Sequence, residues 1–517
     1  MNDSSGENSA GAVERKRDSS HGHPNPTEAD KPTEPTAAVK LNGNDKLLCG
    51  IILGVITFWL FAQTTLNIAP DMGKELGLDA STMNIAVAIT ALFSGIFIVV
   101  MGGFADRVGR VKIVNIGFYL SIGGSLLVGF APAGRMASAF LLTGRALQGL
   151  SGACIMPASL ALVKTYWVGT QRQRAVSLWS IGSWGGSGLC SLFGGLVTQH
   201  LGWRYIFFAS VVVAFIGLIL MHGTPESRAE GKRNYKFDFA GVITFMIAMV
   251  ALQLVVTQGN KLRWTSPYSL LLIAVTVIFG IIFFYIEAHS SAAFVDFTLF
   301  KNPTFTGATV SNFLLNGVTG TQIVSLQLVQ LGGNMTAQQA GELTLGYAVA
   351  IIAFIRVGEK LLQRFGARKP MIWGCLITGL SILLISPTNV MLSDYKILAI
   401  IGYILFGVGL AFYATPSTDA ALSNLPETQA GSGSGIYKMA SSLGAAFGVA
   451  ISAAIFTALS ADTGSVNWLE GVITFQGRQD NLALREAAII ALMVNVLMAV
   501  VAIIAIMLTV PKGREKD

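Results

Sequence analysis

The sequence is poor in charged residues. Of its 517 residues, only 12% are Asp, Glu, Lys or Arg, whereas 52% are hydrophobic. A soluble protein carries about 25% charged residues, so this chain lacks the polar surface that a water-soluble protein of its length needs. Its net charge of +7 is too thinly spread to indicate nucleic-acid binding. We therefore expect lipid to be the solvent for most of the chain.

Cysteines and catalytic motifs are also scarce. The four cysteines (Cys49, Cys154, Cys190 and Cys375) lie in or beside apolar segments, without a CxxC pair or histidines at ligand spacing. They predict packing and no disulfide or metal site. The chain has no GxxxxGK[ST] phosphate loop, which argues against ATP as its energy source. Because no apolar helix carries HExxH or GxSxG either, we expect no cofactor and no enzymatic activity.

The first part of the chain differs from the rest. Residues 1–46 are rich in Ser, Gly, Pro, Asn, Glu and Lys and contain no apolar run. Such a segment cannot bury enough apolar surface to fold, so we expect a disordered tail. It also lacks the short apolar region of a cleaved signal peptide.

Fourteen apolar segments follow, each about as long as the 20 residues that a helix needs to cross a bilayer. They lie near residues 47–69, 82–101, 113–131, 138–163, 176–198, 204–222, 238–258, 267–287, 306–330, 337–358, 371–390, 397–421, 437–460 and 486–510. The pattern predicts an all-α membrane protein with fourteen transmembrane helices. An even number of spans places both termini on the same side.

The cations between the segments predict the orientation. One set of alternate loops is dense in Lys and Arg, with Arg107, Arg110 and Lys112 in the first of them and Arg364, Arg368 and Lys369 in a later one. The opposite loops carry mostly single cations. Cytoplasmic loops carry the excess of Lys and Arg. We therefore expect the dense loops and both termini to be cytoplasmic.

Two of the dense loops form a faint repeat. Arg107-x-Gly109-Arg110-x-Lys112 follows the second segment, and Arg364-x-Gly366-x-Arg368-Lys369 follows the tenth. If the seventh and eighth segments are an insertion, the tenth is the second helix of a second half. Two six-helix halves related by a parallel repeat are a known transporter architecture.

Several motifs resemble those of the major facilitator superfamily. Gly102-x-x-x-Asp106-Arg107-x-Gly109-Arg110-x-Lys112 is similar to its signature loop, and Arg145-x-x-Gln148-Gly149 is similar to its fourth-helix motif. Gly186, Gly194-Gly195 and Gly202-Trp203-Arg204 resemble the fifth-helix motif of its drug/proton antiporters. Pro225-Glu226-Ser227 and residues 294–302 are similar to features of the fourteen-helix drug:H⁺ antiporter subfamily.

The resemblance implies a domain plan and a function. The plan is a cytoplasmic tail at 1–46, a six-helix bundle at 47–222, two linker transmembrane helices at 223–303, a second six-helix bundle at 304–510 and a cytoplasmic tail at 511–517. The implied function is secondary active export of quinolones and other amphipathic drugs or biocides in exchange for protons, by alternating access in a bacterial cell membrane. The implied partners are these drugs, protons and the lipid bilayer, and the implied functional unit is a monomer.

Two positions depart from the subfamily pattern. Ala62 occupies a helix-one position where fourteen-helix exporters commonly carry Asp, and Cys190-Ser191 replaces the Gly-Pro of the fifth-helix motif. The first departure removes the usual candidate for a proton-binding carboxylate, and the second removes a kink thought to seal antiporters against leak. A second hypothesis therefore stays open, namely a proton-linked carrier of a single endogenous metabolite.

The resemblance assigns the signature loop to a latch between the two halves, made by Asp106, Arg107, Gly109 and Arg110. A carboxylate at a helix end can meet the positive end of a second helix and nearby guanidinium groups, and Gly109 permits a tight turn. The alternative is that the cations of this loop only fix the orientation of the chain in the membrane.

Arg145 is a charged residue within the apolar segment 138–163. An ionisable group in hydrocarbon costs about 2.5–3.5 kcal/mol, so a membrane protein that retains one usually uses it. Gln148 lies at i+3 on the same helix face. The resemblance implies that Arg145 lies near a water-filled cavity and tunes a titrating group. The alternative is a buried structural hydrogen-bond centre.

Other candidates for coupling are Arg356 and Glu359, at i and i+3 near the inner end of the tenth segment, and Asp419, near the inner end of the twelfth. A proton carrier needs a group whose pKa changes with access, so Glu359 and Asp419 are the favoured acids. The alternative for Arg356 and Glu359 is an ion pair within one helix.

A polyspecific substrate site should be lined mainly by apolar and aromatic side chains with a few amides. The candidates are Trp59, Gln63, Asn67, Trp179, Trp184, Asn312, Asn316, Gln322 and Tyr413. Packing between helices is the alternative for each aromatic residue, and the glycines around Trp184 favour close helix approach. We expect Lys438 to extend toward the membrane interface.

Overall fold

A computed structural model describes residues 43–229, 238–290, 297–335, 337–461, 473–477 and 480–512. The predicted tail at 1–46 lies outside these residues except for its last part, and the predicted tail at 511–517 lies mostly outside them. Every regular element in the described residues is helical, which confirms the predicted all-α class.

The helices before residue 230 are α1 (Asp45–Ile56), η1 (Thr57–Ala62), α2 (Thr65–Leu76), α3 (Ala80–Val108), α4 (Arg110–Gly129), α5 (Ala137–Tyr166), α6 (Gly169–Ser180), η2 (Ile181–Gly185), α7 (Gly186–His200) and α8 (Arg204–Met221). We call α1–α8 the N-terminal group.

The helices after residue 237 are α9 (Phe239–Leu262), α10 (Pro267–His289), η3 (Phe297–Lys301), α11 (Pro303–Gly317), α12 (Gly320–Leu331), α13 (Ala337–Glu342), α14 (Leu345–Phe365), α15 (Arg368–Ile385), α16 (Leu392–Ser423), η4 (Glu427–Gln429), α17 (Ala430–Ala461) and α18 (Leu482–Thr509). We call α11–α18 the C-terminal group.

Eleven helical stretches of the described residues are long and apolar enough to cross a membrane. Three of the fourteen predicted segments are not among them. The segment 176–198 is divided among α6, η2 and α7, and 306–330 is divided between α11 and α12. The segment 238–258 is α9, whose apolar part, Phe239–Val255, is shorter. The differences therefore come from helix interruptions and from one short apolar run.

Two of the interruptions are π-helical. In η1 the amide of Gln63 donates to the carbonyl of Phe58 at 3.1 Å, which is the i→i+5 bond of a π-turn. Both η1 and η2 lie within otherwise α-helical segments, and the two contact each other. Such widened turns leave the regular i→i+4 hydrogen-bond ladder and occur frequently at functional sites.

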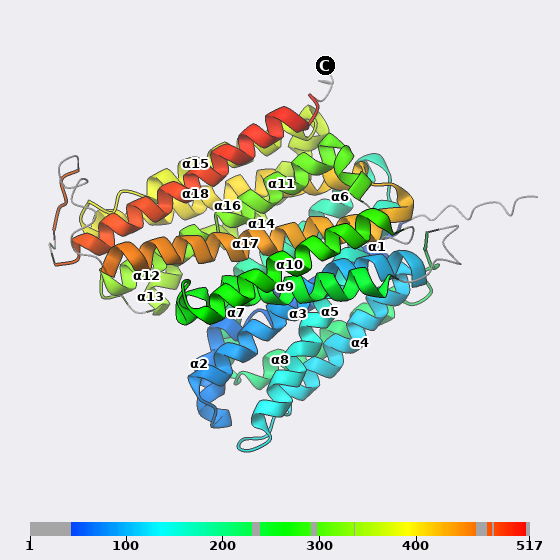
Figure 1. The fold of residues 1–517 in the computed structure, drawn as a ribbon, viewed down its shortest axis with the longest axis horizontal. Coiled ribbons are helices and arrows are strands. Elements are labelled where there is room, and N and C mark those ends of the chain that lie inside the picture. The colour runs from blue at the N-terminus through cyan, green and yellow to red at the C-terminus, as the bar shows by residue number, and fades with distance from the viewer. Residues whose placement is uncertain are drawn as a thin grey trace, which may run out of the picture. The chain divides into compact units, whose positions relative to one another are not determined.

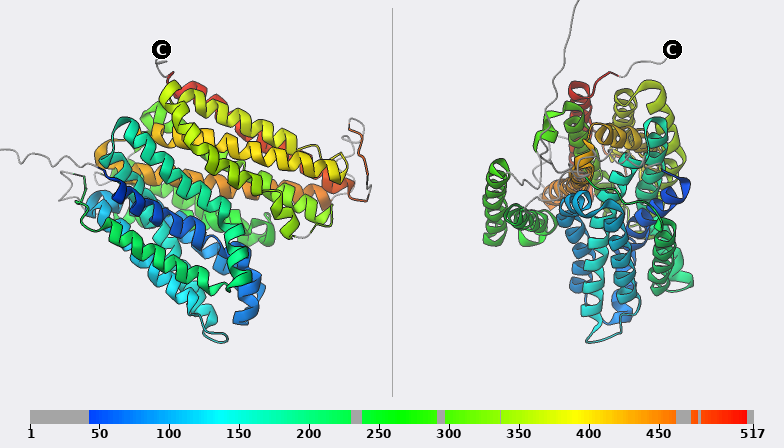
Figure 2. Two further views of the ribbon diagram at one scale, coloured as in Figure 1. Left: turned by 180° about the vertical axis from the view of Figure 1, so that it is seen from behind. Right: turned by 90° about the vertical axis from the view of Figure 1, so that its right-hand side faces the viewer.

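The helices pack as two groups (Figures 1 and 2). In the N-terminal group, α4 packs on α5 and α8, α3 packs on α5, and α1 packs on α8. In the C-terminal group, α15 packs on α16 and α18, α14 packs on α16, and α11 and α17 pack on α18. Between the groups in the sequence, α9 and α10 form a hairpin, and α9 contacts α3 and α17.

Each group contains a close glycine contact between neighbouring helices. A Cβ atom on Gly124 of α4 would lie 2.7 Å from the carbonyl oxygen of Gly144 of α5. In the C-terminal group, a Cβ atom on Gly374 of α15 would lie 2.6 Å from the carbonyl oxygen of Gly409 of α16. Small residues permit such close approach, which is how helices associate strongly without a hydrophobic driving force.

We expect Gly124→Ala to destabilise the protein and Gly123→Ala to leave its stability unchanged. The added methyl of Gly124→Ala meets backbone atoms of α5, whereas at Gly123 nothing lies within 4 Å of an added Cβ. Overpacking of this kind costs about 1–3 kcal/mol. The measurement is the thermal unfolding midpoint of the detergent-purified protein, and equal midpoints for the two variants would contradict the close contact.

Candidate functional site

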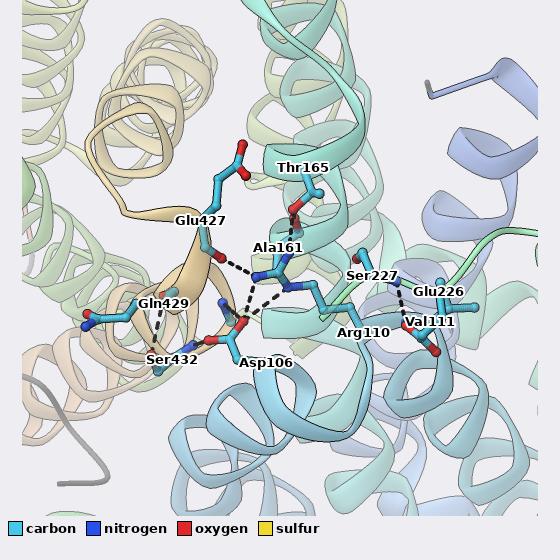
Figure 3. A network of polar contacts seen from close by, with 11 residues as sticks. Asp106, Arg110, Val111, Ala161, Thr165, Glu226, Ser227, Glu427, Gln429 and Ser432 are labelled. Atoms are coloured by element: carbon cyan, nitrogen blue, oxygen red, sulfur yellow. Dashed lines mark hydrogen bonds and ion pairs between the residues drawn. The ribbon is translucent and has the colours of Figure 1, made fainter. Parts of the chain in front are cut away.

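Asp106 lies at the C-terminal end of α3 and contacts the first turn of α17 (Figure 3). Its Oδ1 accepts from the backbone amide of Gly431 at 2.8 Å, and its Oδ2 accepts from that of Ser432 at 3.0 Å. The first amides of a helix have no partner within the helix and carry its positive end. The buried carboxylate therefore links the N-terminal group to the C-terminal group.

Arg110, the first residue of α4, completes this contact. Its Nη2 and Nε donate to Oδ1 of Asp106 at 2.9 and 3.1 Å. Its Nη1 donates to Oγ1 of Thr165 in α5 at 2.6 Å, and its Nη2 also donates to the carbonyl oxygen of Glu427 in η4. The guanidinium thus joins elements of both groups (Figure 3).

Glycines make the approach of α3 and α17 possible. A Cβ atom on Gly102 would lie 2.4 Å from the carbonyl oxygen of Gly431, and one on Gly431 would lie 2.3 Å from that of Gly102. Gly109 precedes α4 with φ 133°, a conformation that L side chains rarely adopt. The glycines that the sequence analysis identified in this loop are therefore required by the geometry.

Glu226 fixes the start of α4 from a distant segment. Its Oε1 accepts from the amide of Val111 at 2.9 Å (Figure 3). Its Oε2 accepts from the amide of Lys112 at 3.0 Å. The amide of Arg110 donates to the carbonyl oxygen of Ser227 at 2.9 Å. A carboxylate at a helix N-terminus is stabilising. The Pro225-Glu226-Ser227 motif thus caps α4, a role that the sequence analysis did not predict.

A second charged contact joins the two groups. Nε of Arg172, near the start of α6, lies 2.9 Å from Oδ1 of Asp419, near the end of α16, and both side chains are largely buried. Nearby, Nζ of Lys164 donates to the carbonyl oxygen of Ser423 at 3.4 Å. The sequence analysis identifies Asp419 but not Arg172 as its partner.

Arg145 is almost completely buried in α5 and is satisfied by uncharged acceptors. Its Nη1 donates to the carbonyl oxygen of Ala62 and to Oε1 of Gln148, both at 2.7 Å. Its Nε donates to the carbonyl oxygen of Ala86 at 3.1 Å. In the described part of the chain, no carboxylate pairs with it. The guanidinium therefore meets the backbone carbonyl of Ala62, one of the two positions at which the sequence departs from the subfamily pattern.

Gln148 extends this centre, because its Nε2 donates to Oγ of Ser125 in α4 at 3.1 Å. Ala62 ends the π-helical η1. The predicted pair of Arg145 and Gln148 thus connects the break in the first segment with α3, α4 and α5. These contacts fit the alternative of a structural hydrogen-bond centre. They also couple Arg145 to the conformation of η1, through Ala62.

Arg356 and Glu359 form an ion pair within α14. The other carboxylate oxygen of Glu359 accepts from Nε2 of Gln363, one turn further on, at 3.2 Å. All three residues belong to one helix, as the alternative of a local ion pair predicts. In the part of the chain that the structure describes, neither side chain makes a polar contact with the opposite group, whereas Asp106 and Asp419 do.

The predicted lining residues do not form a single set. Nδ2 of Asn312 in α11 donates to Oγ of Ser441 in α17 at 2.6 Å, and Nδ2 of Asn316 donates to Oδ1 of Asn312 at 2.9 Å. Tyr413 is buried, and its hydroxyl bonds to those of Ser311 and Ser417. The three residues therefore belong to the interior of the C-terminal group.

The remaining predicted residues lie elsewhere. Gln63 and Trp184 are half-buried at η1 and η2, and Arg107 is half-buried at the end of α3. The side chain of Asn67 lies outside the described part of the structure.

The expectation that Lys438 extends toward the membrane interface is wrong. The side chain is 6% exposed, and its Nζ lies 4.4 Å from the centroid of the Trp179 ring. The residue faces α6 of the opposite group, so extension along the helix to water does not occur. Sequence position near a helix end could not reveal which neighbour the side chain faces.

Known proteins with similar sequences belong to the family that the motifs indicate. The profile of the Major Facilitator Superfamily matches residues 51–311 and 305–516. The Quinolone resistance protein NorB of Staphylococcus aureus strain MRSA252 is 45% identical over 486 residues, which cover 94% of this chain and 99% of NorB. NorB of strain COL is 46% identical over 473 residues, covering 92% and 97%.

Solved structures share the fold. The proton:xylose symporter XylE aligns with a TM-score of 0.60 at 15% identity, covering 91% of this chain and 96% of XylE. The human organic anion transporter MFSD10 aligns with a TM-score of 0.57 at 13% identity, covering 89% and 98%. At such identity the likeness concerns the fold alone.

In the sequence, residues 55–63, 180–188, 356–360, 413–419 and 436–441 resemble NorB beyond the motifs of the wider family. The 45% identity over most of the chain confirms the resemblance to NorB as a whole. The prediction of a transporter, and not of an enzyme, is confirmed by the family match. With its helical fold, its membrane-length helices and these alignments, the chain belongs to the Major Facilitator Superfamily and is a multi-pass membrane transporter.

Proposed function

We propose that this chain is a secondary active multidrug exporter of the bacterial cytoplasmic membrane. It exchanges quinolones and other amphipathic drugs or biocides for protons by alternating access. The observation that carries this proposal is the 45% identity to the Quinolone resistance protein NorB over 99% of that protein's length. The alignment covers 94% of this chain and therefore spans both helical groups. Likeness of this extent favours a shared substrate class.

The proposal includes the finer topology. Fourteen transmembrane helices comprise a bundle at 47–222, two linker helices at 223–303 and a bundle at 304–510, with 1–46 and 511–517 as cytoplasmic tails. The dense Lys and Arg loops support cytoplasmic termini. Because both groups belong to one chain and meet through their own side chains, we propose that a monomer is sufficient for transport.

Alternating access requires the contacts between the two groups to break on one side. Asp106 with the start of α17, and Arg172 with Asp419, lie at helix ends next to the cation-rich loops. Removing one partner of a buried charged pair costs about 3–5 kcal/mol. We propose that these contacts hold the cytoplasmic side closed, with Asp106, Arg107, Gly109 and Arg110 forming the latch.

The coupling carboxylate must differ from that of other exporters, because Ala62 offers only its carbonyl oxygen to Arg145. We propose Asp419, since protonation of its carboxylate removes the attraction to Arg172 of the opposite group. Proton binding then favours opening of the cytoplasmic side. Glu359 and Arg356 have a local role in α14 in this scheme, because their ion pair lies within one helix.

Efflux tests the proposal directly. We expect drug-sensitive bacterial cells that express the chain to export the fluorescent fluoroquinolone norfloxacin faster than cells with empty vector. A protonophore should abolish the difference. No export despite normal membrane abundance would reject the quinolone assignment, and counterflow of a single metabolite without drug competition would favour the alternative of a metabolite carrier.

Arg145→Ala should lower norfloxacin efflux by about tenfold or more at matched membrane abundance, because a charged residue retained in a membrane helix is usually functional. The change leaves three acceptors, in η1, α3 and α5, without their donor. The control is Arg135→Ala, which removes an exposed cation between α4 and α5. Normal efflux by a well-expressed Arg145→Ala variant would restrict Arg145 to packing.

Asp106→Asn should open the cytoplasmic side more often. The neutral amide loses the charge that meets the α17 N-terminus and Arg110. In a variant without native cysteines, Ser434→Cys provides a reporter, because Ser434 is fully buried in α17. We expect Asp106→Asn to accelerate maleimide labelling of this cysteine by about tenfold, a shift of about 1.4 kcal/mol.

The control for the latch experiment is Asp394→Asn, an exposed acid in the first turn of α16. It should leave the labelling rate unchanged. Labelling that Asp106→Asn does not accelerate would show that the buried carboxylate does not limit opening.

A further inference from the structure

Lys438 is a buried cation at the contact between the two helical groups. It belongs to α17 of the C-terminal group, and its Nζ lies 4.4 Å from the centroid of the Trp179 ring in α6 of the N-terminal group. Its side chain is 6% exposed, and Trp179 is fully buried. The pair thus meets across the surface along which the groups move apart during alternating access.

Among the described residues, the ammonium group has no counter-ion. None of the ion pairs in the described part of the chain includes Lys438, and no described side chain or carbonyl accepts a hydrogen bond from its Nζ. A buried charge without a partner is expensive, and the attraction to an indole ring offsets only part of that cost. An anion beside the ammonium would offset the rest of that cost.

The surroundings of Lys438 suit a carboxylate. Ser434 lies one turn before it on α17, so the two side chains share a helix face. The hydroxyl of Ser434 is buried and has no hydrogen-bond partner among the described residues. A carboxylate between them would accept from the ammonium and from this hydroxyl, a charge-assisted arrangement that is stronger than a neutral one.

Trp179 provides a fixed aromatic surface beside the ammonium. Its indole Nε1 donates to Oγ of Ser159 in α5 at 2.9 Å. This bond holds the ring in one orientation within the N-terminal group. An aromatic ring of a ligand gains favourable offset or edge contacts against such a surface.

The position along α17 relates the pair to the latch. Lys438 lies about 9 Å along the helix from Ser432, from the rise of 1.5 Å per residue, and the amide of Ser432 donates to Asp106. In the closed arrangement the latch lies between the pair and the cation-rich loops. Opening of the latch therefore exposes the ammonium and the indole to the cytoplasm together.

From this juxtaposition we infer that Lys438, Ser434 and Trp179 form a subsite for the carboxylate of aromatic amphipathic substrates. The inference rests on the proposed export function and names the substrate class: aromatic acids and zwitterions that carry a carboxylate. Lys438 binds the carboxylate, Ser434 donates to it, and Trp179 contacts the adjoining ring. Substrates without a carboxylate do not depend on this subsite.

Binding to the purified protein tests the subsite independently of transport. The probes are norfloxacin, its methyl ester and the cation ethidium. We expect the intact chain to bind norfloxacin about tenfold more tightly than the ester, and Lys438→Gln to remove this preference. Binding of the ester and of ethidium should change by less than about twofold. Lys438→Arg should retain the preference for the acid, because it keeps the charge.

Transport in inside-out membrane vesicles gives the second measurement. Lys438→Gln should raise KM for norfloxacin by about tenfold, with kcat for ethidium unchanged. Lys512→Gln, which removes an exposed lysine beyond α18, is the matched control. Equal loss of norfloxacin and ethidium binding in Lys438→Gln, at normal abundance, would overturn the subsite in favour of a structural role.

The two proposals fail in different ways. If the intact chain binds the acid selectively through Lys438 but transports no drug, the subsite is supported and the export function is rejected. If the chain exports norfloxacin but binds the acid no more tightly than its methyl ester, the export function is supported and the subsite is overturned.

Discussion

The contact between the Asp106 carboxylate and the first turn of α17 organises the junction of the two helical groups. A buried carboxylate must have its acceptor positions filled, and the free amides of a helix N-terminus fill them with the right polarity. Arg110 supplies the remaining charge and reaches Thr165 and η4 as well. Glu226 then holds the start of α4, so that Arg110 keeps its place. The Asp106 carboxylate of α3 and its partner Arg110 thus link α4, α5, η4 and α17.

Much of the fold follows from the sequence, because hydrophobic length and the distribution of cations act locally. Side-chain pairs within a helix are also predictable: Arg145 with Gln148, and Arg356 with Glu359, lie at i and i+3.

Contacts between distant segments are not predictable in this way. The sequence does not reveal the pairing of Arg172 with Asp419, because the two lie 247 residues apart. The sequence does not reveal the orientation of Lys438 either, because that orientation depends on where α6 packs. The helix breaks at η1, at η2 and between α11 and α12 do not change the hydropathy of their segments. The hydropathy therefore predicts one continuous helix for each of these segments.

The two groups repeat one packing device. In both, a pair of consecutive helices meets through glycines, Gly124 with Gly144 and Gly374 with Gly409. Backbone contacts of this kind leave little room for relative movement within a group, since protein interiors are close-packed. Across the groups, α17 packs on α3 and α5, and polar contacts of three kinds add to this packing: amides with a carboxylate, a guanidinium group with a carboxylate, and an ammonium on an indole. Alternating access requires rigid halves that are joined by contacts able to separate.

The meeting of Gly102 and Gly431 has a consequence for the speed of closure. A surface made of side chains must select one set of rotamers each time it re-forms, and each ordered long side chain loses conformational entropy. Glycine has no rotamers to select. Where α3 and α17 meet through bare backbone, the halves can separate and rejoin without that loss, and the surface that returns is the same one on every cycle.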